Sequence, residues 1–226
     1  MPRETFEREL QRLQDETLAL GSMVECAIME SVEILKQRDE EGSRRVIAQD
    51  RRINEKRFAI EDEALGLIAT QQPMATDLRV IAAVLDITSE LERIGDYAKG
   101  IAKINLLIGK ESLVKPLVDI PRMAERACDM LHQALEAFAE QNVELARAIP
   151  ATDDEVDSLY NQVYRELVTY IIADPCTIEP ANYLLWAAHN LERAADRVTN
   201  ICERVIFTVT GEMLELDIEG GPESIG

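Results

Sequence analysis

The sequence predicts an all-α protein made of two tandem three-helix bundles related by internal duplication. Aromatic residues are only 4% of the chain against 46% hydrophobic residues, so a core must come mainly from aliphatic side chains and Met. This favours helix-on-helix packing, because β-strands prefer aromatic and β-branched residues. Long stretches place apolar residues at alternating spacings of three and four, which is typical of helices packed lengthwise. The same order of elements occurs twice, which indicates duplication.

The first half contains the clearest apolar stripe. It predicts a helix over residues 5–38, roughly 50 Å long at ~1.5 Å per residue. An acidic break begins at Asp39, and a second helix is expected from Gly42 or Ser43 to about Gln72, because Pro73 cannot continue the hydrogen-bond ladder. A third helix is expected to start near Met74 or Ala75 and to run to about Ile108. The stripe of the first helix consists of Phe6, Leu10, Leu13, Thr17, Leu20, Val24, Ala27, Ser31 and Ile34.

The second half repeats this plan after a proline-containing linker over residues 110–121. A fourth helix is expected to end near Glu140, and a fifth to span 142–173 with a break near Pro150. Thr177 is the expected N-cap of a sixth helix, which ends near Thr210.

These elements divide the chain into a first bundle over residues 1–110 and a second over 111–214. The remaining residues, 215–226, are acidic and rich in glycine, and we expect them to form a disordered tail.

The two halves match at an offset of 100 residues. Leu91-Glu92-Arg93 matches Leu191-Glu192-Arg193, and Asp96 matches Asp196. The fifth helix lags by about three residues, so that Asp50 aligns with Asp153 and Asn54 with Asp157. Chance similarity between helices rich in Leu, Ala and Glu is the alternative, but it does not account for the repeated order of elements.

The charge of the chain limits its partners. A net charge of −19 argues against nucleic-acid binding, which needs a Lys/Arg surface. No apolar run approaches the ~20 residues that span a bilayer, so we expect no direct membrane insertion. The N-terminus is charged at once and lacks a secretory signal, so the cytoplasm is the expected location.

Pairs of acids in each half form candidate metal sites. Carboxylates one helical turn apart repel each other, and a multivalent cation would reverse the sign of that interaction. One helix offers too few ligands, so we expect the preceding helix to face it. The eight candidate ligands are Asp50, Asn54, Glu92 and Asp96 in the first half, and Asp153, Asp157, Glu192 and Asp196 in the second.

The two candidate sites are unequal in their ligands. The second site has four acids, whereas an amide, Asn54, replaces one acid in the first; if only one site fills, we expect the second. The alternative to metal binding is that Arg93 and Arg193 form solvated ion pairs with these acids, worth ~0.3–0.5 kcal/mol.

Two alternative functional classes also use long helical bundles. A metal-storage or ferritin-like di-iron bundle would need Glu-x-x-His on two helices. Here His189 precedes Glu192, and the first half has no equivalent histidine. A purely structural bundle is the second alternative. The sequence has no nucleophile-elbow, P-loop, dinucleotide-binding or zinc-protease motif, so we expect a protein that is not an enzyme.

Two segments carry a family resemblance. DLRVIAAVLDITSELERIGDYAKGIA, from Asp77, and YLLWAAHNLERAADRVTNICE, from Tyr183, resemble the two signature helices of the PhoU family. The resemblance covers nearly the whole chain, and DLR…LERIGD and LERxAD…TNI occur in the family's order and spacing.

This resemblance implies a cytoplasmic accessory protein of phosphate-specific transport that negatively regulates the phosphate-starvation response. The implied partners are the ATPase subunit of the phosphate ABC transporter, a sensor histidine kinase and a second copy in a homodimer. Some members bind metal clusters through paired acidic motifs, which map onto the eight candidates above. The implied cofactors are divalent or trivalent ions, with iron and zinc as candidates.

The chain departs from the family pattern at three positions. Asn54 replaces a usual acid, Gly100 stands where the second half has Asn200, and Asp86 stands where lysine is common. These departures make metal occupancy of the first site less secure than that of the second.

Overall fold

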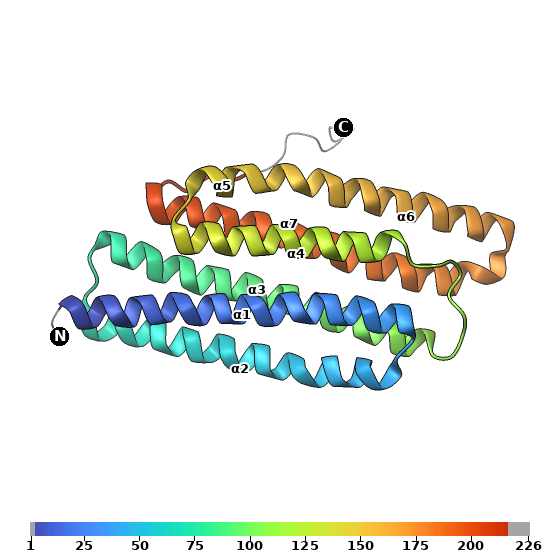
Figure 1. Ribbon diagram of the computed structural model, residues 1–226, viewed down its shortest axis with the longest axis horizontal. Helices are drawn as coiled ribbons and strands as arrows, with labels where there is room; N and C mark the ends of the chain where they lie inside the picture. Colours follow the sequence, from blue (N-terminus) through green and yellow to red (C-terminus); the bar gives the residue numbers. More distant parts are fainter. Residues whose placement is uncertain (1–2, 217–226) are drawn as a thin grey trace, which may run out of the picture.

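The computed structural model describes residues 3–216, which form long α-helices without a β-strand (Figure 1). This confirms the predicted all-α class. Two short 3-10 turns, Ile149–Thr152 and Pro175–Thr177, interrupt the second half. The α-helices are α1 (Arg3–Gln37), α2 (Glu40–Gln71), α3 (Ala75–Ile108), α4 (Asp119–Glu140), α5 (Val143–Ala148), α6 (Asp153–Ala173) and α7 (Ile178–Thr210).

The start of α2 lies earlier than predicted, at Glu40, because Asp39 caps it. The Asp39 carboxylate accepts a hydrogen bond of 2.9 Å from the Gly42 amide. This satisfies one of the amides that a helix start leaves without a partner. The other end of α2 is as predicted, at Gln71, ahead of Pro73.

The predicted break near Pro150 is present. Residues Ile149–Thr152 form a 3-10 turn between α5 and α6. The predicted cap at Thr177 is wrong in detail: Thr177 precedes α7 but makes no cap hydrogen bond. Its backbone is already helical, and its hydroxyl donates to the Asp174 carbonyl at 2.7 Å. Asp174 instead caps the short turn, accepting from the Cys176 amide at 3.0 Å.

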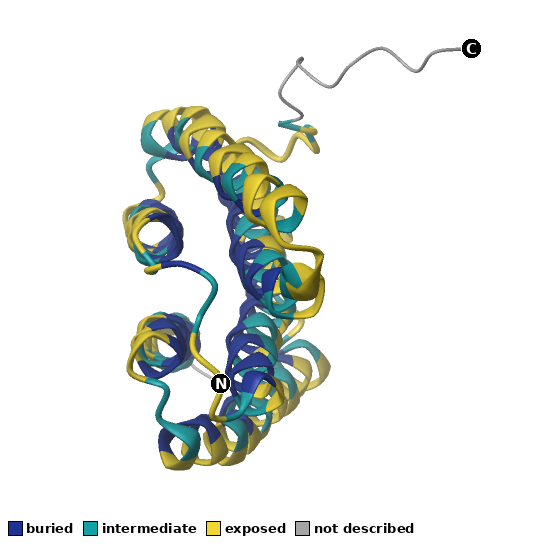
Figure 2. Ribbon diagram, turned by 90° about the vertical axis from the view of Figure 1, so that its right-hand side faces the viewer, coloured by how far each residue is buried: buried dark blue, intermediate teal, exposed yellow. Residues whose placement is uncertain are grey.

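The helices form two layers. Helices α1 and α4 lie side by side in one layer, and α2, α3, α7 and the α5–α6 segment form a second, curved layer (Figures 1 and 2). Helices α1, α2 and α3 pack on one another, as do α4, α6 and α7. The two groups meet along α3 and α7 in one layer and along α1 and α4 in the other.

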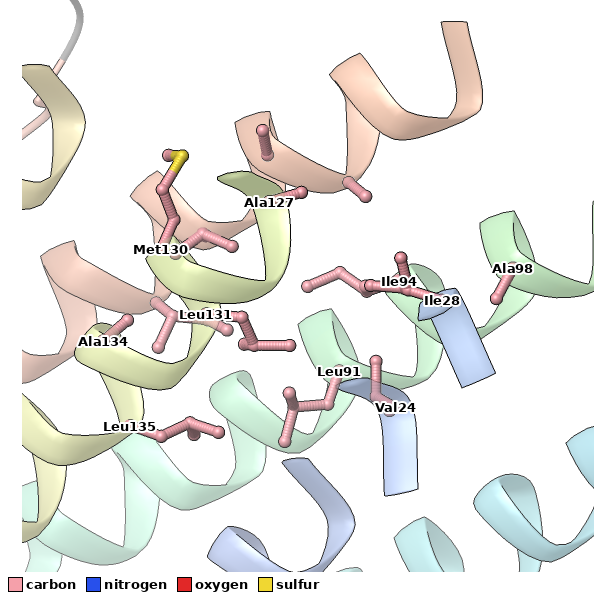
Figure 3. Close-up of a cluster of buried hydrophobic side chains, with 14 of the residues drawn as sticks. Val24, Ile28, Leu91, Ile94, Ala98, Ala127, Met130, Leu131, Ala134 and Leu135 are labelled. Atoms are coloured by element: carbon pink, nitrogen blue, oxygen red, sulfur yellow. The ribbon is translucent and has the colours of Figure 1, made fainter. Parts of the chain in front are cut away.

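One apolar core runs through both groups. Its central side chains are buried and come from both halves of the chain, so each half covers apolar surface of the other. The division into 1–110 and 111–214 therefore stays a prediction. The labelled side chains of Figure 3 are Val24, Ile28, Leu91, Ile94, Ala98, Ala127, Met130, Leu131, Ala134 and Leu135.

Within residues 3–216, no helix is long and apolar enough to cross a membrane. After α7, the chain follows no regular secondary structure over 211–216, and the Leu216 amide donates to Glu203 Oε1 at 2.8 Å. The rest of the predicted tail, 217–226, lies outside the described residues.

Candidate functional site

The acids of the second bundle lie on two packed helices, α6 and α7. Asp153 is the first residue of α6, directly after the Pro150 turn, and Asp157 lies one helical turn further on. Glu192 and Asp196 lie one turn apart on α7. The negative charges of these last three residues all raise the pKa of Asp153, so the four carboxylates are near enough to repel one another. We call these four residues the second cluster.

Burial and mutual repulsion disfavour ionisation in the second cluster. Burial is the main cause that raises the pKa of Asp153 to about 7, followed by the charges of Asp196, Asp157 and Glu192. Burial, then the charges of Asp196 and Asp157, raises the pKa of Glu192 to about 7 as well. The pKa values of Asp157 and Asp196 are also raised, chiefly by burial. Four negative charges are therefore unfavourable here at neutral pH.

The second cluster also has buried oxygens without hydrogen-bond partners. Asp153 is only 8% exposed, and its Oδ1 accepts no hydrogen bond. Glu192 Oε2 accepts none either, although His189 Nδ1 lies 3.0 Å away. Among the described residues, no lysine or arginine lies within 4.0 Å of any of the four carboxylates. Unpaired buried carboxylate oxygens are costly, and no described lysine or arginine side chain offsets that cost in this cluster.

The first bundle holds the equivalent residues on α2 and α3, with one important difference. Lys99 of α3 places its Nζ 2.7 Å from Asp50 Oδ2 and 3.0 Å from Asp96 Oδ1. The contact with Asp50 is the main cause that raises the pKa of the Lys99 ammonium above its ordinary value. We call Asp50, Asn54, Glu92 and Asp96 the first cluster; a lysine ammonium neutralises part of its charge.

The other members of the first cluster are also partnered or near cations. Asn54 Nδ2 donates to Asp50 Oδ2 at 3.2 Å. Burial, followed by the charge of Asp96, raises the pKa of Glu92, while the charge of Arg57 opposes that shift. Asp50 Oδ1 is buried and accepts no hydrogen bond.

The two clusters differ in how well they fit the predicted metal ion. All eight predicted residues lie on paired helices, α2 with α3 and α6 with α7. In residues 3–216, no three His, Cys, Asp or Glu side chains are placed to hold a metal ion together. The first cluster does not fit a metal, because an ammonium lies between its acids. The second fits chemically, since oxygen donors with unpaired buried atoms suit hard cations.

Sequence reasoning assigned no role to Lys99. A signal was present: the first motif continues as Asp96-x-x-Lys99, whereas the second continues as Asp196-x-x-Thr199. The Thr199 hydroxyl donates to the backbone carbonyl of Asp196 at 2.6 Å and adds no charge to the cluster.

These observations define a class: an all-helical protein built from a duplicated three-helix unit, with an acidic cluster at the same place in each copy. The PhoU domain matches this chain twice, over residues 17–104 and 120–205. The chain therefore belongs to the PhoU family.

Relatives and solved structures agree with this assignment. The phosphate-specific transport system accessory protein PhoU homolog of Clostridium acetobutylicum is 35% identical over 96% of this chain and 100% of its own length. The PhoU accessory protein of Escherichia coli K12 is 32% identical over 92% of this chain and 86% of its own.

Two crystal structures share the fold. PhoU from Pseudomonas aeruginosa superposes with a TM-score of 0.86 at 33% identity, covering 92% of this chain and 100% of that one. The regulatory protein PhoU from Streptococcus pneumoniae gives 0.85 at 31% identity, covering 92% and 99%. The family resemblance and the duplicated-bundle fold are thus confirmed.

Proposed function

We propose that this protein is a non-enzymatic accessory protein of phosphate uptake. In this role it restrains the phosphate-starvation response by linking the ATPase subunit of a phosphate ABC transporter to a sensor histidine kinase in the cytoplasm. The main support for this proposal is the sequence similarity to transport accessory proteins, which extends over most of this chain and of each relative. The absence of catalytic sequence motifs supports an adaptor rather than an enzyme.

The outer face of α3 and α7 is the surface we propose for partner binding. It contains a hollow of about 550 Å³ lined largely by charged side chains, among them Arg93, Arg197 and Arg204. Glu90 is one of its lining residues and accepts from Arg93 at 2.8 Å and from Arg197 at 3.4 Å. Because ion pairs hold these charges in place, the surface would select a partner that carries complementary charges.

An aromatic pair on α7, of which Trp186 is the exposed member and Tyr183 is partly buried, adds an anchor for a partner protein. Trp186 is 51% exposed, and its ring packs edge-on against Tyr183 with centroids 5.7 Å apart. Exposed tryptophan is enriched among the residues that contribute most to protein–protein affinity.

We also propose that the second cluster binds a divalent or trivalent cation. Asp153, Asp157, Glu192 and Asp196 would hold the ion, and their mutual repulsion and unpaired oxygens support this assignment. The bound ion would supply the positive charge that the cluster lacks and would join α6 to α7.

A pull-down with the purified ATPase subunit and the cytoplasmic part of the kinase, each from the same organism, tests the adaptor role. We expect both to be captured, and Trp186→Ala to weaken capture by at least tenfold. Tyr170→Ala, at an aromatic residue of α6 that is 42% exposed, is the matched control and should bind normally. No capture by the wild type would refute the proposal, and iron oxidation with turnover would favour the metal-storage or di-iron alternative.

A further inference from the structure

We infer that Lys99 takes the place of a metal ion in the first bundle, so that metal binding is confined to the second bundle. This inference deepens the proposed cation site and rests on it in part. It concerns the first cluster, where the structure disagrees with the eight-residue metal assignment.

The contacts of Lys99 are those that a bridging cation would make. Its ammonium joins Asp50 of α2 to Asp96 of α3, at 2.7 and 3.0 Å. The Asp50 side chain is only 8% exposed, so the pair is shielded from water. Charge-assisted hydrogen bonds of this length are strong, and removing one partner would leave a buried charge unpaired.

The second bundle provides an internal comparison. Thr199 occupies the position equivalent to Lys99, and Asp157 the position equivalent to Asn54. The first cluster has three carboxylates beside one ammonium; the second has four carboxylates and, among the described residues, no ammonium within ion-pair distance. A metal ion entering the first cluster would have to displace Lys99. Both clusters keep a buried carboxylate oxygen without a hydrogen-bond partner, Asp50 Oδ1 in the first and Asp153 Oδ1 in the second, so the ammonium is what distinguishes them.

Space next to Lys99 makes the exchange testable. A cavity of about 360 Å³ lies between α1, α2 and α3, and both Lys99 and Asp50 line it. Met23, Cys26 and Ile53 form part of its apolar wall. A shorter side chain at position 99 would therefore leave room for an ion and its water, without crowding the core.

The first experiment asks whether removing Lys99 creates a metal site. Mn²⁺ is the probe, because it prefers oxygen ligands over the thiols of this chain. In a Glu192→Gln/Asp196→Asn background, which removes the second site, free Mn²⁺ is counted by electron paramagnetic resonance. We expect no tight binding in the background, and at least tenfold tighter binding after Asn54→Asp/Lys99→Thr. Asn54→Asp/Lys103→Thr is the control and should not bind, because Lys103 makes no ion pair among the described residues.

The second experiment needs no metal. In excess chelator, Lys99→Thr should lower the Tm, because Asp50 and Asp96 lose their cation. Thr199→Lys should raise the Tm by about 2–4 °C, because the second cluster gains one. This separates the two ideas: if the wild type binds no Mn²⁺ but both Tm shifts occur, the proposed cation site fails and the role of Lys99 stands.

Three outcomes would overturn the inference itself. The first is that the Glu192→Gln/Asp196→Asn background binds Mn²⁺ and that adding Asp50→Asn abolishes this binding. Such a result would place the metal beside Lys99. The second is a folded Asn54→Asp/Lys99→Thr variant, by circular dichroism, that gains no Mn²⁺ affinity. The third is an unchanged Tm for Lys99→Thr in chelator.

Discussion

At the scale of single residues, the second cluster combines burial with repulsion between acids. Asp153 lies at the start of α6, where the helix N-terminus favours a negative charge, yet burial raises its pKa to about 7. Arg193, whose charge lowers the pKa values of Glu192 and Asp196, has its guanidinium 5.5 Å from the centre of the Tyr97 ring. Arg197 and His189 lower the pKa of Asp196 only as minor causes. Desolvation therefore outweighs the nearby cations.

These pKa shifts predict a pH dependence of stability. A carboxyl group whose pKa is raised from its ordinary ~4 binds protons in the folded state that the unfolded state has already lost. Stability from Asp153 and Glu192 is thus present below pH ~4 and is lost as the pH rises through about 7. In chelator, the Tm should fall between pH 5 and pH 8. Asp153→Asn/Glu192→Gln should flatten this fall, and parallel profiles for the variant and the wild type would contradict the pKa assignment.

At the scale of the elements, caps and prolines set the helix ends. Asp39→Ala removes the carboxylate that accepts from the Gly42 amide and should lower the free energy of unfolding by ~1 kcal/mol, measured in urea. Thr177→Ala is the matched control, because Thr177 precedes α7 without a cap bond and loses only an exposed hydrogen bond to the Asp174 carbonyl, so it should cost only a few tenths of this. Equal losses at both positions would show that the loss at Asp39 is not specific to its cap bond.

The elements also show what the sequence could predict. The three-four stripes and Pro73 located α1 to α3 within a few residues, because apolar spacing and proline act locally. The repeat likewise predicted that α2 faces α3 and that the equivalent helix of the second half faces α7, and these helices do pack on one another. The cap at Thr177 was predicted wrongly, because threonine can hydrogen-bond backward as well as forward along the chain.

Sequence reasoning could have paired Lys99 with Asp96 but not with Asp50. A lysine side chain is long and flexible, and the acids on the neighbouring helix determine its direction. Asp96, three residues before it, was visible in the sequence, but the closer contact is with Asp50 of α2. The packing of α2 on α3 had to be known before Lys99 could be paired with that residue.

At the scale of the whole molecule, the shared core couples the two halves. Ile94 of α3 is fully buried among side chains of both halves (Figure 3). Ile94→Ala should lower the free energy of unfolding by about 2–5 kcal/mol, through lost burial and the cavity left behind. Because the core is shared, we expect the second half to be destabilised together with the first.

The single tryptophan makes this coupling measurable. Trp186 lies on α7, in the other half of the chain from Ile94. Its fluorescence and the circular dichroism signal should shift to lower urea by the same amount in Ile94→Ala. A shift in circular dichroism alone, with the Trp186 transition unchanged, would show that the halves unfold independently.

The two clusters at equivalent places are proposed to have different cations: a lysine in one and a metal ion in the other. Asp50 and Asp153 are equivalent in the repeat and equally buried, at 7% and 8% exposure, so their asparagine variants form a matched pair. The deciding measurement is the number of tightly bound Mn²⁺ ions per chain in wild type, Asp50→Asn and Asp153→Asn. We predict an unchanged number for Asp50→Asn and loss of binding for Asp153→Asn. Loss of Mn²⁺ in Asp50→Asn, or full retention in Asp153→Asn, would contradict this assignment of cations.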